Sequence, residues 1–355
     1  MKILLVEIAT SGHRLGYIKA LLECCDAEFI LVIPEQTDLP CKQYIVPFDS
    51  INNQRSLKRY RHWLKEIRAI EKKEKTDITH FLYGDGFYRF FGAFLRHYRK
   101  KGLTTLHLVR NGRVQETSLK AVCRKVNRVV VHSKYLQNDL TNLKIRNTKH
   151  IEYPQFNKLN YEKDKSRSFF GLREDLPVLL CLGATRSDKG LDLLLEALKG
   201  VRHPFQLLIA GKEEDIKKDN ILEHSTDFRD SVFLYLQYLS DDELGMALAA
   251  SDIVCIPYRK SFNAASGPLG EGVMLNKCII GPDHGNLGKT IRDYHLGYVF
   301  ESENTEDLSN VLNQALTEAF YPDESYRKYQ ESLNVSYFKR EYAALYKEIA
   351  NQNLS

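Results

Sequence analysis

Two short segments in the second half of the chain carry residue types that suit a diphosphate group. The first, residues 183–190, reads Gly-Ala-Thr-Arg-Ser-Asp-Lys-Gly and follows an apolar run at 177–182. It places Arg186 and Lys189 at the entrance of an expected helix, where free N–H groups and the helix dipole also attract anions. This segment therefore predicts a phosphate-binding loop.

The second segment, residues 266–273, reads Ser-Gly-Pro-Leu-Gly-Glu-Gly-Val and follows an apolar run at 252–257. Its small residues precede an expected helix, and Glu271 supplies a carboxylate within the first turns. Two such segments in one sheet indicate a nucleotide bound at the carboxyl ends of parallel strands.

Alternating apolar runs and helical patterns must position these segments. In the second half we expect strands at 177–182, 205–210, 232–236, 252–257, 277–281 and 297–300, and helices at 191–198, 241–249, 271–275, 287–293 and 305–319. The first half predicts strands at 3–7, 29–34, 78–83, 103–108 and 128–132, and helices at 14–24, 54–73, 88–100 and 133–140. Strands alternating with helices predict βαβ units, and right-handed crossovers give doubly wound parallel sheets. The chain therefore predicts an α/β protein with two Rossmann-like domains.

The length of 355 residues also favours two domains. A polar stretch without periodicity at 153–167 is the expected connection, so we assign 1–160 to an N-terminal Rossmann-like domain and 161–336 to a C-terminal one. Apolar residues at helical spacing in 337–352 predict a last helix that returns to the first domain, which adds 337–355 to it. We expect the two domains to face each other across a cleft, a common place for a ligand.

The composition, with 43% hydrophobic and 27% charged residues, is typical of a globular protein. The chain has no apolar run of membrane-spanning length, and Met1–Glu7 predicts a first strand, not a signal peptide. The seven Cys are odd in number and scattered, which favours reduced thiols in a cytosolic protein over disulfides or a metal site. The chain has no metal-binding, zinc or Walker motif, so we expect no metal.

The positive charge is concentrated in one stretch. Residues 55–128 hold 20 Lys and Arg against 6 Asp and Glu, so they carry +14, whereas the whole chain carries +5. Aromatic residues are interleaved with these charges. Nucleic acid and an anionic membrane surface are both candidate partners for such a stretch.

The ordered motifs of the second half resemble those of glycosyltransferase family 4. The run Gly183-x-x-Arg186-x-x-Lys189-Gly190 looks like the family's phosphate-binding loop, and the matching pieces follow in the family's order at 208–211, 238–244, 249–258, 266–273 and 281–291. The resemblance covers about residues 165–318, and 129–136 also fits. It implies a GT-B fold in which 1–160 binds the acceptor and 161–336 binds the nucleotide-sugar. It also implies retaining transfer from a UDP- or GDP-sugar without a metal.

The resemblance also implies roles for individual residues. Arg186 and Lys189 would stabilise the charge that develops on the diphosphate leaving group, in the loop that Gly183 opens. Glu271 would accept hydrogen bonds from the ribose hydroxyls, since a carboxylate can accept two donors. Tyr238 would flank the nucleobase.

The sugar end of the expected site departs from the family. Eight residues before Glu271 the family often has a second Glu, where this chain has Asn263. Some members carry a Pro-Tyr…Ser-Gly form of the motif, which 257–258 and 266–267 resemble, and contacts to the donor sugar would then come from Asn263, Ser266 and Gly267. From the first domain, Gly12 would let the backbone approach a ligand, and His107 would face the donor sugar.

We therefore expect a cytoplasmic retaining glycosyltransferase of polysaccharide or glycoconjugate synthesis. It would act on a hydroxyl of a saccharide acceptor, free or lipid-linked. The stretch 55–128 would bind the anionic inner face of the membrane, and we expect no nucleic-acid partner. Three alternatives stay open: a non-catalytic nucleotide-sugar-binding subunit, motivated by Asn263; a nucleotide-sugar epimerase on the same fold, for which Asp85 is the clear candidate carboxylate; and a nucleic-acid binder.

Overall fold

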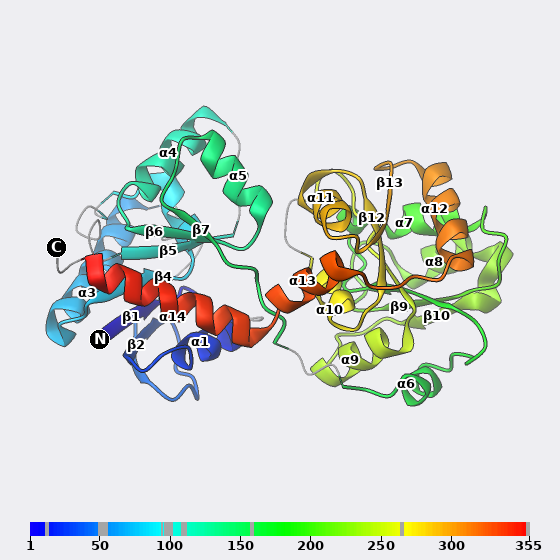
Figure 1. Ribbon diagram of the computed structural model, residues 1–355, viewed down its shortest axis with the longest axis horizontal. Helices are drawn as coiled ribbons and strands as arrows, with labels where there is room; N and C mark the ends of the chain where they lie inside the picture. The colour runs from blue at the N-terminus through cyan, green and yellow to red at the C-terminus, as the bar shows by residue number, and fades with distance from the viewer. Residues whose placement is uncertain are drawn as a thin grey trace. The chain divides into compact units, whose positions relative to one another are not determined.

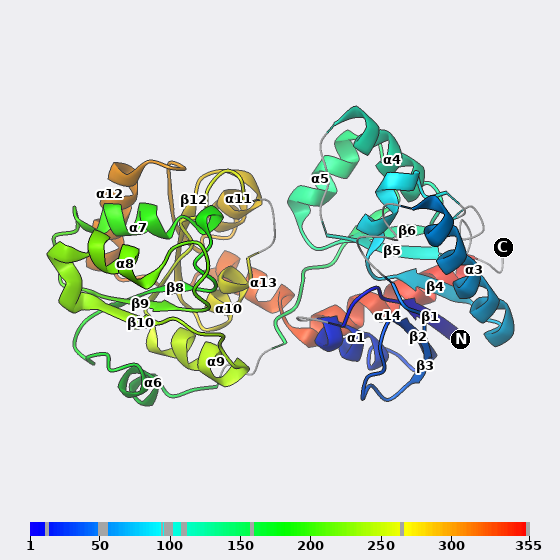
Figure 2. The same ribbon diagram turned by 180° about the vertical axis from the view of Figure 1, so that it is seen from behind.

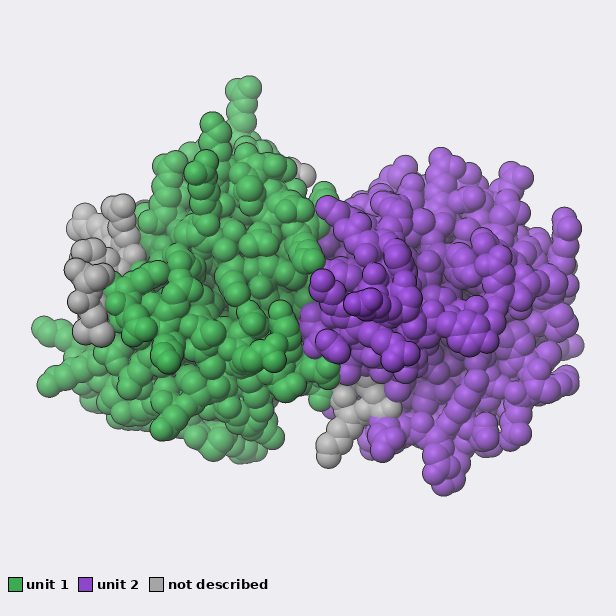
Figure 3. Space-filling model, in the orientation of Figure 1, with its two compact units in different colours: residues 1–156, 334–355 green, residues 157–333 purple. Residues whose placement is uncertain are grey.

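The computed structural model describes residues 1–10, 14–48, 56–93, 95, 102–107, 112–156, 160–262 and 266–352. The chain forms two compact units, which Figure 3 shows in different colours. The first unit contains residues 1–156 and 334–355, and the second contains residues 157–333.

The first unit contains a seven-stranded parallel sheet in the order β3-β2-β1-β4-β5-β6-β7. In that order the strands are Lys42–Ile45, Glu28–Ile33, Lys2–Val6, Ile78–Phe81, Gly102–Leu106, Arg128–Val131 and Thr148–His150. Because β1 pairs with β2 on one side and β4 on the other, the winding direction changes between β1 and β4. Sheets of this kind bind ligands at the carboxyl edge beside such a switch point.

Helices cover both faces of this sheet (Figures 1 and 2). One face packs against α1 (Arg14–Leu22) and α14 (Val335–Gln352), and the other against α3 (Leu57–Glu74), α4 (Arg113–Cys123) and α5 (Lys134–Asn142). Strand residues alternate between the two cores, as the pleat requires. The last helix therefore returns to the first unit, as the sequence predicts, and buries Phe338, Tyr342, Leu345, Tyr346 and Ile349 there.

Helix α3 shows how the basic stretch folds. Ser56 caps it by accepting the N–H of Arg59, and Lys75 ends it in the left-handed conformation. Its apolar stripe is buried, including Tyr60 and Trp63, so these aromatic side chains pack in the core instead of mixing with the surface charges. Most basic side chains of α3 are exposed, whereas Arg68 is half-buried.

The second unit contains a six-stranded parallel sheet in the order β10-β9-β8-β11-β12-β13. In that order the strands are Val232–Tyr235, Gln206–Ala210, Val178–Leu182, Ile253–Cys255, Cys278–Pro282 and Gly297–Phe300. One face packs against α7 (Leu191–Leu198), α8 (Lys218–His224) and α12 (Thr305–Thr317), and the other against α9 (Asp241–Ala250), α10 (Gly267–Met274), α11 (Gly285–Asp293) and α13 (Glu324–Ser332). Here the switch point lies between β8 and β11.

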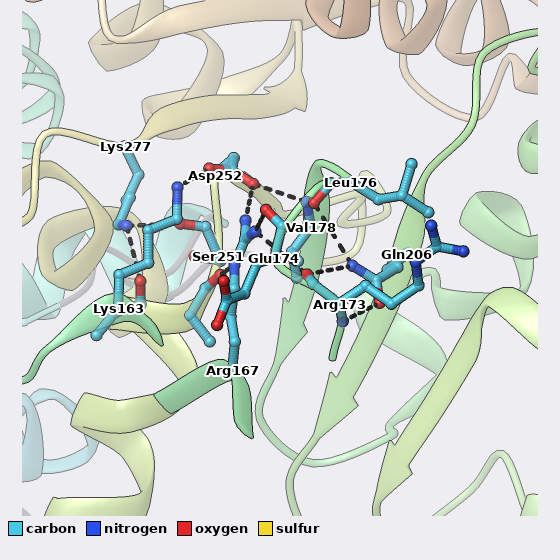
Figure 4. A network of polar contacts seen from close by, with 12 residues as sticks. Lys163, Arg167, Arg173, Glu174, Leu176, Val178, Gln206, Ser251, Asp252 and Lys277 are labelled. Carbon is cyan, nitrogen blue, oxygen red and sulfur yellow. Dashed lines mark hydrogen bonds and ion pairs between the residues drawn. The ribbon is translucent and has the colours of Figure 1, made fainter. Parts of the chain in front are cut away.

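A polar network fastens helix α6 (Lys163–Phe169) to the amino edge of the second sheet (Figure 4). The guanidinium of Arg167 is almost fully buried and donates to Asp252 Oδ2 at 2.6 Å and to the carbonyl of Ala250 at 3.1 Å. Asp252 also accepts the N–H of Val178 at 2.8 Å and pairs with Lys163 at 2.6 Å. The Asp252 carboxylate thus connects the amino-terminal ends of β8 and β11 to α6.

Several sequence-based expectations were wrong at the level of elements. The connection expected at 153–167 contains the start of α6, and the short edge strands β3 and β7 and the helices α4, α8 and α13 were missed. The helix expected at 88–100 is replaced at its start by a 3₁₀ helix, η1 (Gly84–Phe90), and much of the rest lies outside the described residues. Helix α10 begins at Gly267 and not at 271, so Glu271 lies in its second turn.

Candidate functional site

The two segments singled out from the sequence follow β8 and β11, the two strands that flank the switch point of the second sheet. The first continues into a short 3₁₀ turn, η3 (Ser187–Lys189), and then into α7. The second leads into α10. The parallel pairing of the strands brings both segments to the same carboxyl edge.

Gly183 and Lys189 form the inner part of the first loop. Gly183 has φ +109°, and a Cβ built there would lie 2.4 Å from Nζ of Lys189, so the ammonium occupies the space that a side chain would need. Nζ also lies 5.5 Å from the ring centroid of the buried Tyr258, within range of a cation–π contact. Burial lowers the pKa of Lys189, which the nearby Glu271 carboxylate opposes.

Arg186 lies on the outer part of the same loop. Its guanidinium forms two hydrogen bonds to Asp188, at 2.9 and 2.8 Å, and about 44% of its side chain is exposed. Asp215 accepts the N–H of Ser187 at 2.9 Å, and Arg259 donates to the Ser187 carbonyl at 3.0 Å. These bonds hold the loop while leaving Arg186 at the surface.

The loop is also fixed by close backbone approaches. Gly190 has φ +64°, and a Cβ there would lie 2.1 Å from the carbonyl oxygen of Pro257, at the end of β11. Gly211 has φ +145°, and its Cβ position lies 2.3 Å from the carbonyl oxygen of Gly183. Both positions therefore require glycine, and the ends of β8, β9 and β11 are pressed together.

The second segment is organised by its helix start. Ser266 caps α10 by accepting the N–H of Leu269 at 3.3 Å, and its hydroxyl lies 3.5 Å from that of Tyr258. Glu271 is buried, and the Cβ position of Gly267 is 3.8 Å from its Oε2. The structure therefore brings Gly183, Lys189, Ser266, Gly267 and Glu271 to one place.

Three of the residues singled out from the sequence lie elsewhere or outside the described residues. Tyr238 follows β10, and 84% of its side chain is exposed, more than for any other large apolar side chain of the described residues. Asn263 and Gly12 fall in stretches that the structure does not describe.

His107 comes directly after β5 in the first unit, at the carboxyl edge of the sheet, where β4 separates β5 from the switch point. Its backbone N–H donates to Asp85 Oδ2 at 3.1 Å, and its Nδ1 lies 3.4 Å from the same oxygen. The rings of Tyr83 and His132 lie 5.0 and 5.5 Å away.

Glu7 and Arg14 complete this edge of the first sheet. Glu7 directly follows β1 and accepts hydrogen bonds from Arg14 and from the N–H of Ile8, and the Arg14 guanidinium lies 4.6 Å from the Tyr83 ring centroid. Burial raises the pKa of Glu7, against the effect of Arg14. Of these neighbours only Asp85 was named from the sequence. Glu7, Tyr83 and His132, the last residues of expected strands, and Arg14, the first residue of an expected helix, were missed; those positions were the available signal.

The described residues lack both a metal-binding cluster and a membrane-spanning helix. No group of three or more His, Cys, Asp and Glu side chains among them is arranged to hold a metal ion. No helix in the described part of the chain is both long and apolar enough to cross a membrane.

In a comparison with known proteins, residues 162–332 match the model of the family Glycosyl transferases group 1. The curated protein MJ1178 of Methanocaldococcus jannaschii, an uncharacterized glycosyltransferase, is 25% identical over 194 residues, which cover 52% of this chain and 48% of that protein. The chain thus spans about half the length of the curated relative that it matches.

Solved structures match nearly the whole chain. Sucrose-phosphate synthase from Thermosynechococcus elongatus has a TM-score of 0.76 at 16% identity, covering 98% of this chain and 99% of its own. A glycosyltransferase from Rickettsia africae has a TM-score of 0.75 at 19% sequence identity, and the match covers 98% of both chains. HepE of Anabaena, solved with UDP and glucose, has a TM-score of 0.71 at 15% identity, and the match covers 98% of this chain and 100% of HepE. These likenesses show that the two Rossmann-like domains form the GT-B fold.

Proposed function

We propose that this chain, whose residues 162–332 match the family model Glycosyl transferases group 1, is a retaining enzyme of family 4 that moves a sugar from a UDP- or GDP-sugar to a saccharide hydroxyl. The observation that carries the proposal is the position of the Lys189 ammonium against Gly183, on the loop after β8 at the switch point of the second sheet, in electrostatic interaction with Glu271. A cation and a carboxylate at this edge suit the two ends of a nucleoside diphosphate.

The chemistry of such a donor explains the arrangement. When the glycosidic bond breaks, negative charge develops on the diphosphate. A partly buried ammonium stabilises that charge more than one in water does, because the local dielectric constant is lower. Lys189 would contact the diphosphate from inside the loop and Arg186 from its outer side, and Glu271 would hold the ribose.

The remaining residues complete the proposed donor site. The N–H groups at the start of α10, beside Ser266 and Gly267, would face the donor together with Asn263, and Tyr238 would cover the base. From the first unit, Gly12 and His107 would contact the donor or acceptor. We propose no metal and no general base, since a front-face retaining reaction can use an oxygen of the donor's own phosphate.

The acceptor side of the proposal concerns the membrane. Helix α3 exposes Lys58, Arg59, Arg61, Lys65, Lys72 and Lys73. Each basic side chain near anionic lipid contributes about 1 kcal/mol, so several on one helix can hold a protein at a membrane surface. We propose that this face binds the anionic inner leaflet and that lipid-linked saccharides serve as acceptors for polysaccharide or glycoconjugate synthesis.

The experiment is a donor panel. UDP-glucose, UDP-galactose, UDP-N-acetylglucosamine and GDP-mannose are each incubated with the protein, with and without membrane extract, and release of UDP or GDP is measured. Release that depends on the extract is expected for one donor. Binding without release would favour a non-catalytic subunit, and no binding of any donor would overturn the proposal.

One observation supports the epimerase as a second candidate. Glu7, Asp85 and His107 gather at the carboxyl edge of the first sheet, which supplies the acid and base groups that an epimerase needs. Analysis of the sugar recovered in the same panel separates the two activities, because an epimerase changes a sugar centre without needing an acceptor.

A further inference from the structure

We propose that Asp85 is a positioning residue that holds the imidazole of His107 in a single tautomer, with the proton on Nδ1 and a lone pair on Nε2. The inference deepens the proposed function, since His107 is expected to meet the donor. The positioning itself depends only on contacts within the first unit.

The backbone before Asp85 explains why its carboxylate lies against β5. Gly84 begins η1 shortly after β4, which ends at Phe81, and a Cβ at Gly84 would lie 2.2 Å from Thr104 Oγ1 and 3.0 Å from the carbonyl oxygen of Thr105. The chain at Gly84 is therefore in contact with β5, and no side chain fits between them. This approach carries Asp85 to the end of β5, where only 2% of its side chain is exposed.

A single carboxylate oxygen fixes both the backbone and the ring of His107. Oδ2 of Asp85 accepts the backbone N–H at 3.1 Å and lies 3.4 Å from Nδ1. A carboxylate can only accept, so Nδ1 must carry the proton, and a neutral imidazole then presents Nε2 as an acceptor. About 31% of the His107 side chain is exposed, so the ring is accessible to a ligand.

His132, whose ring lies 5.5 Å from that of His107, also has a defined tautomer. His132 places Nδ1 at 2.7 Å from the carbonyl oxygen of Ile151 and Nε2 at 3.2 Å from the hydroxyl of Tyr17. Because the carbonyl only accepts, His132 carries its proton on Nδ1, and Tyr17 must donate to Nε2. Burial lowers the pKa of His132 to about 3, so this neighbour stays neutral.

The charged groups near His107 do not replace Asp85. Glu7 interacts with His107 electrostatically, but its recorded hydrogen bonds are to Arg14 and the N–H of Ile8. The Tyr83 ring packs against the His107 ring in a tilted arrangement, with 5.0 Å between the ring centroids. Among the recorded contacts, the bond that selects one ring nitrogen of His107 comes from Asp85.

The first test reads the tautomer directly and needs no substrate. The protein is labelled with ¹⁵N-histidine, the His107 signals are assigned by their loss in His107→Gln, and ring nitrogen shifts are measured near pH 8. We expect the Nδ1–H form in the wild type. In Asp85→Ala the Nε2–H form, which free imidazole prefers, should become the major one.

The control is Asp77→Ala, which removes a carboxylate that accepts the N–H of Lys2 at 2.7 Å just before β4, at the opposite edge of the sheet. It should leave the His107 signals unchanged. If Asp85→Ala does not fold, Asp85→Ser retains a small polar group one bond too short to reach Nδ1. An Nε2–H form in the wild type, or an Nδ1–H form that survives in the Asp85 variant, would overturn the positioning role.

The second test is a double-mutant cycle on donor turnover, using whichever donor of the panel is active. Asp85→Ala should lower kcat/KM about 10- to 100-fold in the otherwise wild-type protein, mainly through kcat, and should have almost no further effect in His107→Gln. Additive losses would contradict the proposal. If no donor turns over, the proposed function fails, while the tautomer measurement still decides the role of Asp85.

Discussion

At the scale of single residues, the two cations of the proposed diphosphate loop differ in what binding requires of them. Lys189 is partly buried beside Gly183 and Tyr258, and desolvation lowers its pKa. Arg186 is already paired with Asp188 through both of its recorded bonds. A diphosphate would therefore gain a full new partner at Lys189, whereas at Arg186 it must share the guanidinium with Asp188 or displace it.

Removing the ammonium should consequently weaken phosphate binding and leave nucleoside binding nearly unchanged. We expect Lys189→Ala to reduce affinity for UDP or GDP by about 1.5–3 kcal/mol, which is more than tenfold, because a hydrogen bond to a charged group is lost. Titration calorimetry with the diphosphates and with uridine or guanosine measures both effects.

The matched control is Lys199→Ala, which removes an exposed Lys that pairs with Glu196 beyond the end of α7. It should bind both ligands as the wild type does. Equal weakening of nucleoside and nucleoside diphosphate by Lys189→Ala would show that the residue shapes the loop without contacting phosphate.

At the scale of elements, helix α14 is attached to the first sheet by hydroxyl groups as well as by apolar packing. Tyr342 is buried and hydrogen-bonds to the hydroxyl of Tyr17, with Thr105 Oγ1 at 3.4 Å. Tyr346 lies 2.7 Å from Nδ1 of His80, whose Nε2 lies 2.9 Å from Thr105. These residues come from α1, α14 and two strands, so the network joins elements that are far apart in the sequence.

Loss of one hydroxyl from this network should destabilise the protein. We expect Tyr342→Phe to lower the free energy of unfolding by about 1–2 kcal/mol, because it leaves buried polar partners with one bond fewer. Urea denaturation followed by circular dichroism measures the change. Tyr337→Phe on the same helix, where the ring is only half-buried, should change stability little, and an equal loss in both variants would argue against the network.

Lys277, which belongs to the polar network around Asp252 in Figure 4, gives a prediction with a defined pH window. Burial lowers the pKa of Lys277 to about 8, from an ordinary value of 10.5, although Nζ donates to the carbonyls of Ser251 and Ala249. Between these two values the unfolded chain holds a proton that the folded chain has released. The contribution of Lys277 to stability therefore rises with pH across this window.

The measurement is the free energy of unfolding of the wild type and of Lys277→Met at several pH values. The free energy of unfolding of the wild type minus that of Lys277→Met should increase from about pH 8 to 10.5 and should be constant below pH 7. Lys199→Met, at an exposed position, should show no such trend. Parallel curves for wild type and Lys277→Met would contradict the prediction.

What the sequence could predict follows from how each element is stabilised. Central strands such as β8 are buried on both faces and appear as continuous apolar runs, which composition reveals directly. Edge strands β3 and β7 have partly exposed polar side chains, and α6 and α8 are short and polar, so no periodic signal marks them.

The same reasoning applies to the candidate site. The loop around Lys189 is continuous in the sequence, so its residue types were sufficient to predict it. The Asp85–His107 contact joins positions 22 residues apart, and it depends on the close approach of Gly84 to β5. No pattern of residue types reveals such an approach.

At the scale of the whole molecule, positive charge is the feature that the proposal connects to the membrane. We expect the protein to sediment with vesicles of phosphatidylcholine containing phosphatidylglycerol at 0.1 M salt, and to be released as salt is raised, because exposed charges are screened. Replacing Lys58, Arg61 and Lys65 together by Glu should abolish this binding.

The control carries the same change in net charge on the other unit. Lys199, Lys217 and Lys218 are exposed there, and their joint replacement by Glu should leave vesicle binding almost unaffected. If both triple variants lose binding equally, net charge and not the α3 face is responsible.

The first unit is interrupted in the sequence, and this has a consequence for synthesis. Its core requires Phe338, Tyr342, Leu345, Tyr346 and Ile349 of α14, which the ribosome makes after the whole of the second unit. During translation the second unit can therefore complete its core first, although it comes later in the chain. Until α14 emerges, the nascent first unit has an open apolar sheet face, which is a surface that a chaperone would recognise.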